Sequence, residues 1–398
     1  MSSVAIIGAG AAGYFAAIQL VEQGFTGEIK LYEKSKALAK VKVSGGGRCN
    51  VTHACFDPKE LTQYYPRGNK EMLGPFHHFQ PGDMIGWLAD HGVELKVEDD
   101  GRMFPTSDSS QTIIDCFESA LPAGTLVSKG VKHLAATDNG WQLNFDDGES
   151  AVVDRVIVTA GSSPQFSSIL KSMGIAMVDA VPSLFTFHIE DDALRALSGL
   201  AIEAEVRLKG AEWTTDGPML LTHWGVSGPA VLKMSAWGAR WLAERNYHAE
   251  VVINSMPRYH KESLLETLQG IRINAARKLV RNVGPSSVPN RWWQFVIKDN
   301  TAIDKMWADV KNVELEEMLA VLLELSLPIS GKATFKEEFV TAGGVDLKSV
   351  NFKNMESKTH PRMHFAGEVL NIDALTGGFN FQAAWTTAFL AAKGIVES

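Results

Sequence analysis

The stretch Val4-Ala5-Ile6-Ile7-Gly8-Ala9-Gly10-Ala11-Ala12-Gly13 decides the fold, because it joins an apolar strand to a Gly-x-Gly-x-x-Gly turn. We expect a helix over Tyr14–Gln23 and a second strand, Ile29–Tyr32, that ends at Glu33. Strand, glycine turn, helix, strand and acid, in this order, form the first half of a dinucleotide-binding unit. A glycine-rich turn without a ligand would not explain the acid about twenty residues after the glycines.

The glycines and the acid have separate tasks in such a site. Gly8 permits the tight turn, Gly10 lets the backbone approach a pyrophosphate, and Gly13 lets the helix pack on the strand. The phosphates would lie at the helix N-terminus, where N–H groups are free and the helix dipole favours negative charge. Glu33 would bind a ribose hydroxyl. The motif alone does not separate NAD from FAD.

Length and composition indicate a globular protein. The chain has 398 residues, of which 45% are hydrophobic and 21% charged, and this length predicts two or three domains. No apolar run is long enough to span a bilayer, and the apolar N-terminus lacks the basic leader of a signal peptide. Three cysteines, Cys49, Cys55 and Cys116, make no disulfide framework. We therefore expect a cytoplasmic protein without a membrane partner, as a monomer or small homo-oligomer, and no metal site.

The middle of the chain has a different pattern of apolar residues from its ends. Alternating stretches such as Ala201–Leu208 and Ala249–Ile253 predict antiparallel strands, and residues 259–282 and 313–326 predict helices. Together they indicate an inserted domain, residues 186–334, of antiparallel strands plus a helical segment at about 255–326. A second Gly-x-Gly-x-x-Gly motif is missing from this stretch, so a nicotinamide cofactor has no obvious module of its own.

The C-terminal region supplies the second cofactor signal. His364–Glu368 reads as a strand that ends in a Gly-acid pair, and Thr376–Asn380 opens a last helix, Phe381–Lys393. Flavoproteins with the two-dinucleotide-binding fold close their FAD site in this way. The sequence thus predicts an α/β fold with a discontinuous Rossmann-like FAD domain, residues 1–185 and 335–398, around the insertion. Residues 151–161 are expected to form one buried strand that runs into a small-residue loop.

Several motifs in the same order resemble a known family over nearly the whole chain. The chain is similar to the BaiN/YhiN-type bacterial flavoproteins, typified by aminoacetone oxidase, within the glutathione-reductase-like FAD fold. The resemblance implies FAD, a discontinuous FAD domain and an inserted domain, but little about the substrate. Departures from the family pattern are Leu38-Ala39, Asn371 and Phe379, where the family often has Gly-Arg, Asp and Tyr. The blocks that carry the resemblance are Lys40 with Ser44–Asn50, Gly101–Pro105, Thr222–Pro229, Thr341–Val345 and Gly367–Asn380.

Motifs and resemblance together predict the cofactor residues. Thr159-Ala160-Gly161 would pack under FAD, Asp373 would hold ribityl hydroxyls, and the backbone of Val131 would contact adenine. The helix after Thr376–Asn380 would stabilise the charge of reduced flavin. The expected cofactor-binding residues are Gly8, Gly10, Ala12, Gly13, Glu33, Lys40, Ser44, Gly45, Gly46, Arg48, Cys49, Asn50, Val131, Thr159, Ala160, Gly161, Gly367, Glu368, Asp373, Gly377, Gly378, Phe379 and Asn380.

Three side chains are candidates for a chemical role. Arg48 could hold a phosphate or a substrate carboxylate through two hydrogen bonds, and the alternative is a solvated surface arginine. His223 could exchange a proton during hydride transfer, and the alternative is a histidine that caps a turn. Cys49 suggests a dithiol relay, but its spacing from Cys55 matches no recognised redox motif, so we interpret it as a packed residue beside the cofactor.

Three functions remain open at this point. The first is an FAD-dependent oxidoreductase that transfers hydride between flavin and a small organic substrate, with NAD(P)H as a possible transient donor. The second is an FAD-dependent RNA-modifying protein, because residues 258–299 carry eight Lys/Arg against three acids around Trp292-Trp293 in an acidic chain of net charge −8. A solvated helix face with core tryptophans is the simpler reading of that segment. The third is a binding protein with a structural or sensing flavin.

Overall fold

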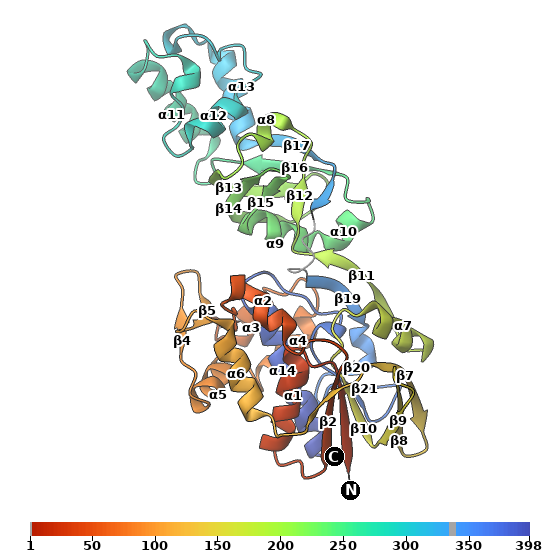
Figure 1. Ribbon diagram of the computed structural model, residues 1–398. Helices are drawn as coiled ribbons and strands as arrows, with labels where there is room; N and C mark the ends of the chain where they lie inside the picture. Colours follow the sequence, from red (N-terminus) through yellow and green to blue (C-terminus); the bar gives the residue numbers. More distant parts are fainter. Residues whose placement is uncertain (1, 334–339) are drawn as a thin grey trace. The chain divides into compact units, whose positions relative to one another are not determined.

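The computed structural model describes residues 2–333 and 340–398. Its contacts divide the chain into two compact units, which are described separately (Figure 1). The first unit contains Met1–Pro182 and Lys336–Ser398, and the second contains Ser183–Phe335. The second unit is therefore inserted into the chain of the first.

A parallel sheet forms the centre of the first unit, in the order β22-β10-β1-β2-β6. Ile6 and Ile157 lie opposite each other on β1 and β10 and are fully buried. Helices cover both faces of such a sheet, which explains the near-continuous apolar runs of its strands. The strands of this sheet, with the edge pair β20 and β21, are β1 (Ser3–Ile7), β2 (Glu28–Glu33), β6 (Leu126–Ser128), β10 (Arg155–Val158), β20 (Val350–Asn351), β21 (Glu356–Ser357) and β22 (Met363–Phe365).

One predicted strand is in fact two. Residues 151–158, expected as a single buried strand, divide at Asp154 into β9 (Ser150–Val153) and β10. Asp154 accepts hydrogen bonds from the backbone N and the hydroxyl of Ser3, at 2.7 and 2.8 Å. Only β10 joins the parallel sheet, whereas β9 belongs to a meander with β7 and β8. Val156, Ile157 and Val158 of β10 are buried, whereas Val152 of β9 is 68% exposed, so apolar residue type alone did not separate the two strands.

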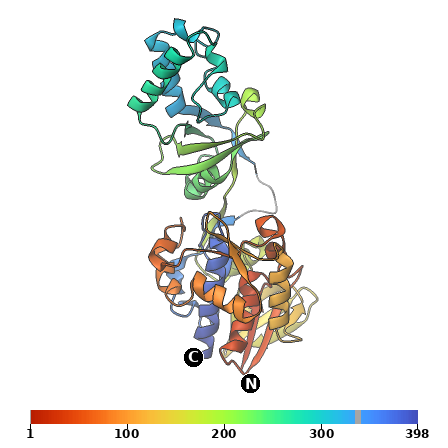
Figure 2. The ribbon, with the colours of Figure 1, turned by 90° about the vertical axis from the view of Figure 1, so that its left-hand side faces the viewer.

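Two long helices from opposite ends of the chain pack together beside the parallel sheet. α1 (Ala11–Glu22) lies against α14 (Phe379–Val396), as both views of the ribbon show (Figure 1 and Figure 2). Small side chains such as Ala16 and Ala388 are fully buried there, and the Phe15 and Trp385 rings lie 5.6 Å apart. This packing brings the C-terminal glycines to the N-terminal glycine turn.

Shorter elements complete the first unit. Two small antiparallel sheets have the orders β3-β5-β4 and β7-β8-β9, and β11 pairs with β19. The remaining elements of the first unit are α2 (Ala39–Gly47), β3 (Thr52–His53), α3 (Pro58–Thr62), α4 (Asn69–Phe76), α5 (Pro81–Asp90), β4 (Leu95–Val97), β5 (Arg102–Pro105), α6 (Ser110–Ala120), β7 (Val131–Thr137), β8 (Gly140–Phe145), α7 (Pro164–Ser172), β11 (Met177–Ser183), β19 (Val340–Val345), η3 (Leu347–Ser349) and η4 (Gly367–Val369).

The second unit has an antiparallel sheet in the order β17-β16-β13-β14-β15-β12-β18. Buried and more exposed residues alternate along its strands, so one face of the sheet is apolar. Along β13, Ile202, Ala204 and Val206 are buried, while the residues between them are half-buried or exposed. The strands of this sheet are β12 (Thr186–His188), β13 (Ala201–Leu208), β14 (Thr214–Thr222), β15 (Gly225–Ser227), β16 (Ala249–Asn254), β17 (Leu325–Ile329) and β18 (Gly331–Ala333).

In the second unit, α13 (Asn312–Leu323) packs against β16 and β17 and contacts α11 (Lys261–Asn274) and α12 (Asn290–Val296), whereas α9 (Pro229–Trp237) packs against β13 and β14. Trp292, Trp293 and Trp307 are fully buried among them, and the Trp293 indole donates to the carbonyl of Val280 at 2.8 Å. The simpler reading of Trp292-Trp293, as core residues, is therefore confirmed, and neither ring is available to stack on a nucleic-acid base. The helices of this unit are α8 (Asp192–Arg195), α9 (Pro229–Trp237), α10 (Ala239–Ala243), α11 (Lys261–Asn274), η1 (Val280–Asn282), α12 (Asn290–Val296), η2 (Trp307–Asp309) and α13 (Asn312–Leu323).

The predicted fold class is confirmed. The chain combines a Rossmann-type α/β unit with a separate unit that is rich in β-strands and carries a helical segment. Among the described helices, none has the length and the apolar composition that a membrane span requires.

Candidate functional site

The glycine turn between β1 and α1 has two crowded positions and one open position. Gly8 has φ of +106°, and a Cβ there would lie 2.6 Å from the carbonyl oxygen of Thr159. A Cβ on Gly13 would lie 1.9 Å from the carbonyl oxygen of Gly8. A Cβ on Gly10 would meet no heavy atom of the described residues within 4 Å. Gly8 and Gly13 thus fix the turn, and Gly10 leaves room for a ligand.

The turn suits an anion. Gly10 is the N-cap of α1 and makes no side-chain capping hydrogen bond, and the first turn of the helix contains no acidic side chain. Free N–H groups and the positive end of the helix dipole therefore face the open position. A pyrophosphate is the ligand that this arrangement fits.

Glu33 lies beside the same turn. Its carboxylate accepts hydrogen bonds from Ala9 N at 2.9 Å and from Ser35 N and Oγ at 2.8 and 2.7 Å. Val131 begins β7 next to this position, because a Cβ on the preceding Gly130 would come within 3.1 Å of Lys34 Cβ. A fixed carboxylate and a neighbouring strand end are the two features that the adenosine half of a dinucleotide would need.

The predicted loop after β10 packs on the glycine turn. The Thr159 hydroxyl donates to the carbonyls of Gly8 at 2.7 Å and Ile7 at 3.0 Å. Ala160 follows, and Gly161, with φ of +58°, would place a Cβ 3.6 Å from a carboxylate oxygen of Glu368. The loop therefore joins the N-terminal turn to the C-terminal Gly-acid pair.

The Gly-acid pair itself contacts two other predicted residues. A Cβ on Gly367 would lie 2.8 Å from the Cβ of Ala12. Glu368 forms an ion pair with Lys40 at 2.6 Å and accepts a hydrogen bond from Thr341 N at 3.3 Å. Residues far apart in the sequence are thus brought together around the N-terminus of α1.

A second glycine turn begins α14. Gly377 and Gly378 have φ of +131° and +92°, and a Cβ on Gly378 would lie 2.5 Å from the carbonyl oxygen of Thr52. With its amide oriented to match its neighbours, Asn50 accepts from Gly378 N and donates to the carbonyl of Thr52, each at 3.0 Å. The Asn380 amide exchanges two hydrogen bonds with the backbone of Ala374, both at 3.0 Å. These contacts fix the N-terminus of α14, whose first turn has no acidic residue.

Two predicted cofactor residues have other roles. The Asp373 side chain is fully buried and forms a two-point ion pair with Arg67, so it does not present a carboxylate to a ribityl chain. Phe379 is 1% exposed, and its ring stacks on Tyr64 and His53 at centroid distances of 4.1 and 4.5 Å. Only the backbone of Phe379 can face a cofactor. Both residues instead hold the loop that leads into α14.

The segment Ser44–Asn50 leaves helical geometry at Ser44, in agreement with the predicted loop. α2 begins at Ala39, and the left-handed residues Gly45 and Gly46, with φ of +57° and +69°, end its regular part. Neither Gly46 nor Gly47 has a described heavy atom within 4 Å of a built Cβ, so this backbone also borders open space. The Ser44 hydroxyl donates to the carbonyl of Val41 at 2.9 Å.

Arg48 and Cys49 are both engaged by the protein. The Arg48 guanidinium donates to Glu98 at 2.6 Å and lies 4.0 Å from the centroid of the Phe104 ring. Its charge is therefore paired, and a role toward phosphate or substrate would require it to leave Glu98. Cys49 is fully buried, and burial raises the pKa of its thiol to about 12. Cys49 and Cys55 are both buried free thiols, and burial raises the pKa of each, which disfavours the reactive thiolate.

His223 lies in the second unit. It forms, with Trp224, the exposed turn between β14 and β15, where the two rings are 5.0 Å apart. Trp224 is 41% exposed, unlike the buried tryptophans of the helical segment. The turn is held by the Thr222 hydroxyl, which donates to the carbonyl of Gly225 at 3.2 Å. His223 is thus a solvent-accessible imidazole on a short hairpin.

The residues of the first unit fit FAD. The open backbone at Gly10, Gly46 and Gly47 would accept the cofactor. Glu33 would then contact its ribose, and the N-terminus of α14 would face its flavin. Asn371 supplies a further indication: its side-chain oxygen is buried and has no hydrogen-bond partner among the described residues. A hydroxyl-rich ribityl chain is a donor that would satisfy such an oxygen.

Some residues that hold this site in place were not predicted from the sequence. Arg67, Tyr64 and His53 hold the loop before α14, and Gln382 accepts from the buried Thr52 hydroxyl at 2.7 Å. None of them belongs to a motif with a known spacing, so only the tertiary contacts identify them. In the described part of the chain, no group of three or more His, Cys, Asp or Glu side chains could hold a metal ion.

The chain is similar to several known proteins. The sequence profile of a family described as "HI0933-like protein Rossmann domain" matches residues 2–394. The chain is 26% identical to a "Ribosomal RNA dihydrouridine synthase" of Haemophilus influenzae, over 98% of this chain and 97% of that protein. It is 24% identical to a "3-dehydro-bile acid delta(4,6)-reductase" of Clostridium scindens, over 100% of both chains. Among solved structures, 3-ketosteroid delta1-dehydrogenase from Sterolibacterium denitrificans aligns over 100% of both chains with a TM-score of 0.49 and 11% identity.

Proposed function

The chain belongs to the HI0933-like Rossmann family of flavin-dependent oxidoreductases, and on that premise we propose that it reduces a carbon–carbon double bond conjugated to a carbonyl group. The observation that carries this proposal is chemical. Both names borne by the full-length relatives describe the saturation of such a bond, in the uracil ring of uridine and in a 3-oxo steroid. The substrates differ, but the reacting group is the same.

Some residues of the chain would bind the cofactor, and another would act on the substrate. Bound FAD would supply the hydride after NAD(P)H has reduced it. Gly10, Glu33 and the N-terminus of α1 would hold its adenosine and pyrophosphate half, and the N-terminus of α14 would favour the negative charge of its reduced flavin half. Saturation also requires a proton on the second carbon. His223 is our candidate for that proton, because an imidazole exchanges protons near neutral pH.

NAD(P)H is the proposed electron donor. The insertion carries no second Gly-x-Gly-x-x-Gly motif, so the donor would dock transiently and leave after it reduces the flavin. A small enone is the first candidate acceptor. Uracil in RNA is the second, and a specific observation favours it: within residues 258–299, four basic side chains are exposed and form neither a hydrogen bond nor an ion pair with described residues. These are Arg258, Lys261, Arg277 and Lys278.

Anaerobic absorbance spectra of the purified protein test the proposal. We expect flavin bands that bleach on addition of NADH or NADPH and return when an acceptor is added. Return with 2-cyclohexenone but not with a ribosomal RNA fragment identifies a small-molecule reductase, and the reverse identifies an RNA-modifying enzyme. Flavin that no nicotinamide reduces, or that neither acceptor reoxidises, contradicts the proposal. Protein that binds no FAD contradicts the cofactor assignment itself.

The role of His223 needs a separate measurement. We expect His223→Ala to lower turnover by roughly a hundredfold, as for the loss of a general acid, while FAD affinity and the rate of flavin reduction stay the same. His248→Ala is the matched control, because His248 is another exposed histidine of the same unit. Unchanged turnover in His223→Ala, or an equal loss in the control, removes His223 from the mechanism.

A further inference from the structure

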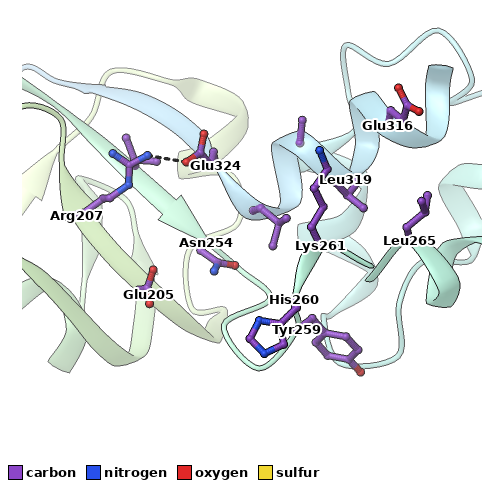
Figure 3. A pocket seen from close by; sticks show the side chains of 13 residues that line it. Glu205, Arg207, Asn254, Tyr259, His260, Lys261, Leu265, Glu316, Leu319 and Glu324 are labelled. Atoms are coloured by element: carbon purple, nitrogen blue, oxygen red, sulfur yellow. Dashed lines mark hydrogen bonds and ion pairs between the residues drawn. The ribbon is translucent and has the colours of Figure 1, made fainter. Parts of the chain in front are cut away.

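A pocket of about 670 Å³ lies in the second unit, and none of its lining residues is assigned to the cofactor (Figure 3). Its walls come from neighbouring strands β13 and β16, the start of α11 and one face of α13. The volume falls within the range of pockets that take small organic ligands. Of the residues that the proposed function uses, only Lys261 lines this pocket.

One wall pairs a carboxylate with an amide. Glu205 and Asn254 are directly opposite each other on β13 and β16, so their side chains share one face of the sheet (Figure 3). Glu205 is half-buried, and its side chain forms no hydrogen bond or ion pair with any described residue. The Asn254 side-chain oxygen accepts from Met256 N at 2.8 Å, which leaves its NH₂ group as the free donor. The wall therefore offers two acceptor oxygens beside a donor.

The other walls are apolar at the middle and carry charged side chains of both signs. Leu319 and Leu323 of α13 line the pocket, with Leu265 of α11 beside them. Arg207 and Glu324 form an ion pair at 2.8 Å, so they add no net charge.

The start of α11 supplies the cation, Lys261, while Glu316 of α13 also lines the pocket and Glu262 follows in the first turn of α11. Lys261 is the first residue of this helix, and the N-cap His260 makes no side-chain capping hydrogen bond. The lysine and the free N–H groups of the first turn can both meet an anion there.

We propose that this pocket binds a guanine nucleotide. The guanine edge presents two adjacent N–H donor groups, which match the two oxygens of the Glu205 carboxylate, and its carbonyl oxygen matches the Asn254 amide donor. Adenine presents one such donor group beside an acceptor nitrogen, and uracil presents one N–H. Leucine side chains suit the faces of a planar base, and Lys261 with the α11 N-terminus suits a phosphate.

Calorimetric titration of the full chain with GMP, AMP and UMP tests this inference. We expect GMP to bind, and AMP and UMP to bind more weakly by roughly tenfold or more. Glu205→Gln should weaken GMP by a similar factor, because the amide replaces one acceptor with a donor. Glu203→Gln is the matched control: Glu203 lies on the same strand and the same face, is exposed, and does not line the pocket. Lys261→Met should weaken GMP but not guanosine.

The source of the base is decided by a second titration with a short single-stranded RNA that contains one guanosine. Binding of this RNA at least as tight as that of GMP assigns the pocket to RNA, and weaker binding assigns it to a free nucleotide. No binding of either ligand, equal binding of AMP, or an unchanged GMP affinity in Glu205→Gln overturns the inference. These titrations require no flavin chemistry, so their failure is distinct from a failure of the proposed function.

Discussion

The candidate site of the first unit is formed mainly by backbone, and that of the second unit mainly by side chains. In the first unit the candidate cofactor site consists of backbone at glycine turns, where Gly10 and Gly46 border open space and Gly8 and Gly13 do not. In the second unit the pocket consists of side chains, among them Glu205, from strands and helices far apart in the sequence. A backbone site leaves a glycine spacing in the sequence, whereas a side-chain pocket leaves no spacing at all. The first can therefore be read from the chain, and the second requires the fold.

The largest effect is expected at the first glycine turn, where the comparison predicts that a crowded glycine controls stability. Gly13→Ala should lower the free energy of unfolding of the FAD-free protein by about 3 kcal/mol or more, because its Cβ would lie 1.9 Å from the carbonyl oxygen of Gly8. Helix propensity alone would favour alanine there, so a loss of stability must come from the clash. Urea unfolding measures the effect.

Gly10→Ala is the matched control for that clash. It should change stability by no more than about 0.5 kcal/mol, since its Cβ would meet no described atom within 4 Å. It should nevertheless raise the Kd for FAD by roughly tenfold or more, because the methyl group occupies the approach of the pyrophosphate. Wild-type FAD affinity in Gly10→Ala would show that the cofactor does not use this turn.

A smaller effect is expected at a buried carboxylate of the second unit. Glu314 is 4% exposed, and hydrogen bonds from the Lys305 ammonium at 2.6 Å and from Lys311 N at 2.9 Å lower its pKa from 4.5 to about 2. The carboxylate therefore stabilises the folded state fully above about pH 5, and this stability is lost as pH falls through the folded pKa. Glu314→Gln should cost about 1–3 kcal/mol at pH 7, and the difference from the wild type should shrink toward pH 2.

Denaturant unfolding between pH 7 and pH 2 measures this linkage. Glu316→Gln is the control, because Glu316 is exposed on the same helix and has no ion-pair partner among the described residues. It should leave stability within about 0.5 kcal/mol at each pH. A difference between wild type and Glu314→Gln that does not vary with pH would mean that Glu314 titrates normally.

The smallest expected effect is at Cys49 in the first unit. Burial raises the pKa of its thiol to about 12, so the reactive thiolate is scarce at pH 8. We expect no alkylation of Cys49 by iodoacetamide in the folded protein and complete alkylation in urea, as measured by mass spectrometry. Fast alkylation of the folded protein would reopen the dithiol interpretation.

Much of the first unit was predictable because its glycines and apolar runs have fixed spacings. The parallel sheet, the turn at Gly8–Gly13 and the last helix follow from patterns that reflect burial on both faces and close backbone approach. The roles of Asp373 and Phe379 were not predictable. Their partners, Arg67 and Tyr64, lie about three hundred residues away in the chain and share no spacing rule with them.

The second unit shows the same limit for charge and aromatic patterns. Eight basic residues around Trp292-Trp293 were compatible with a nucleic-acid surface, because composition does not reveal which side chains face solvent. Packing decided the matter: the tryptophans form core, while Arg258, Lys261, Arg277 and Lys278 stay exposed.

The sequence by itself determined the dinucleotide turn, the class of fold and the order of the inserted unit, since these depend on local spacing and on the period of apolar residues. Only the tertiary structure decided which polar groups are free and which are paired. It joined Arg48 to Glu98 and Asp373 to Arg67, and it placed Glu205 beside Asn254 at the edge of a pocket. The physical reason is that hydrogen bonds and ion pairs act over a few ångströms in space, whatever the distance along the chain.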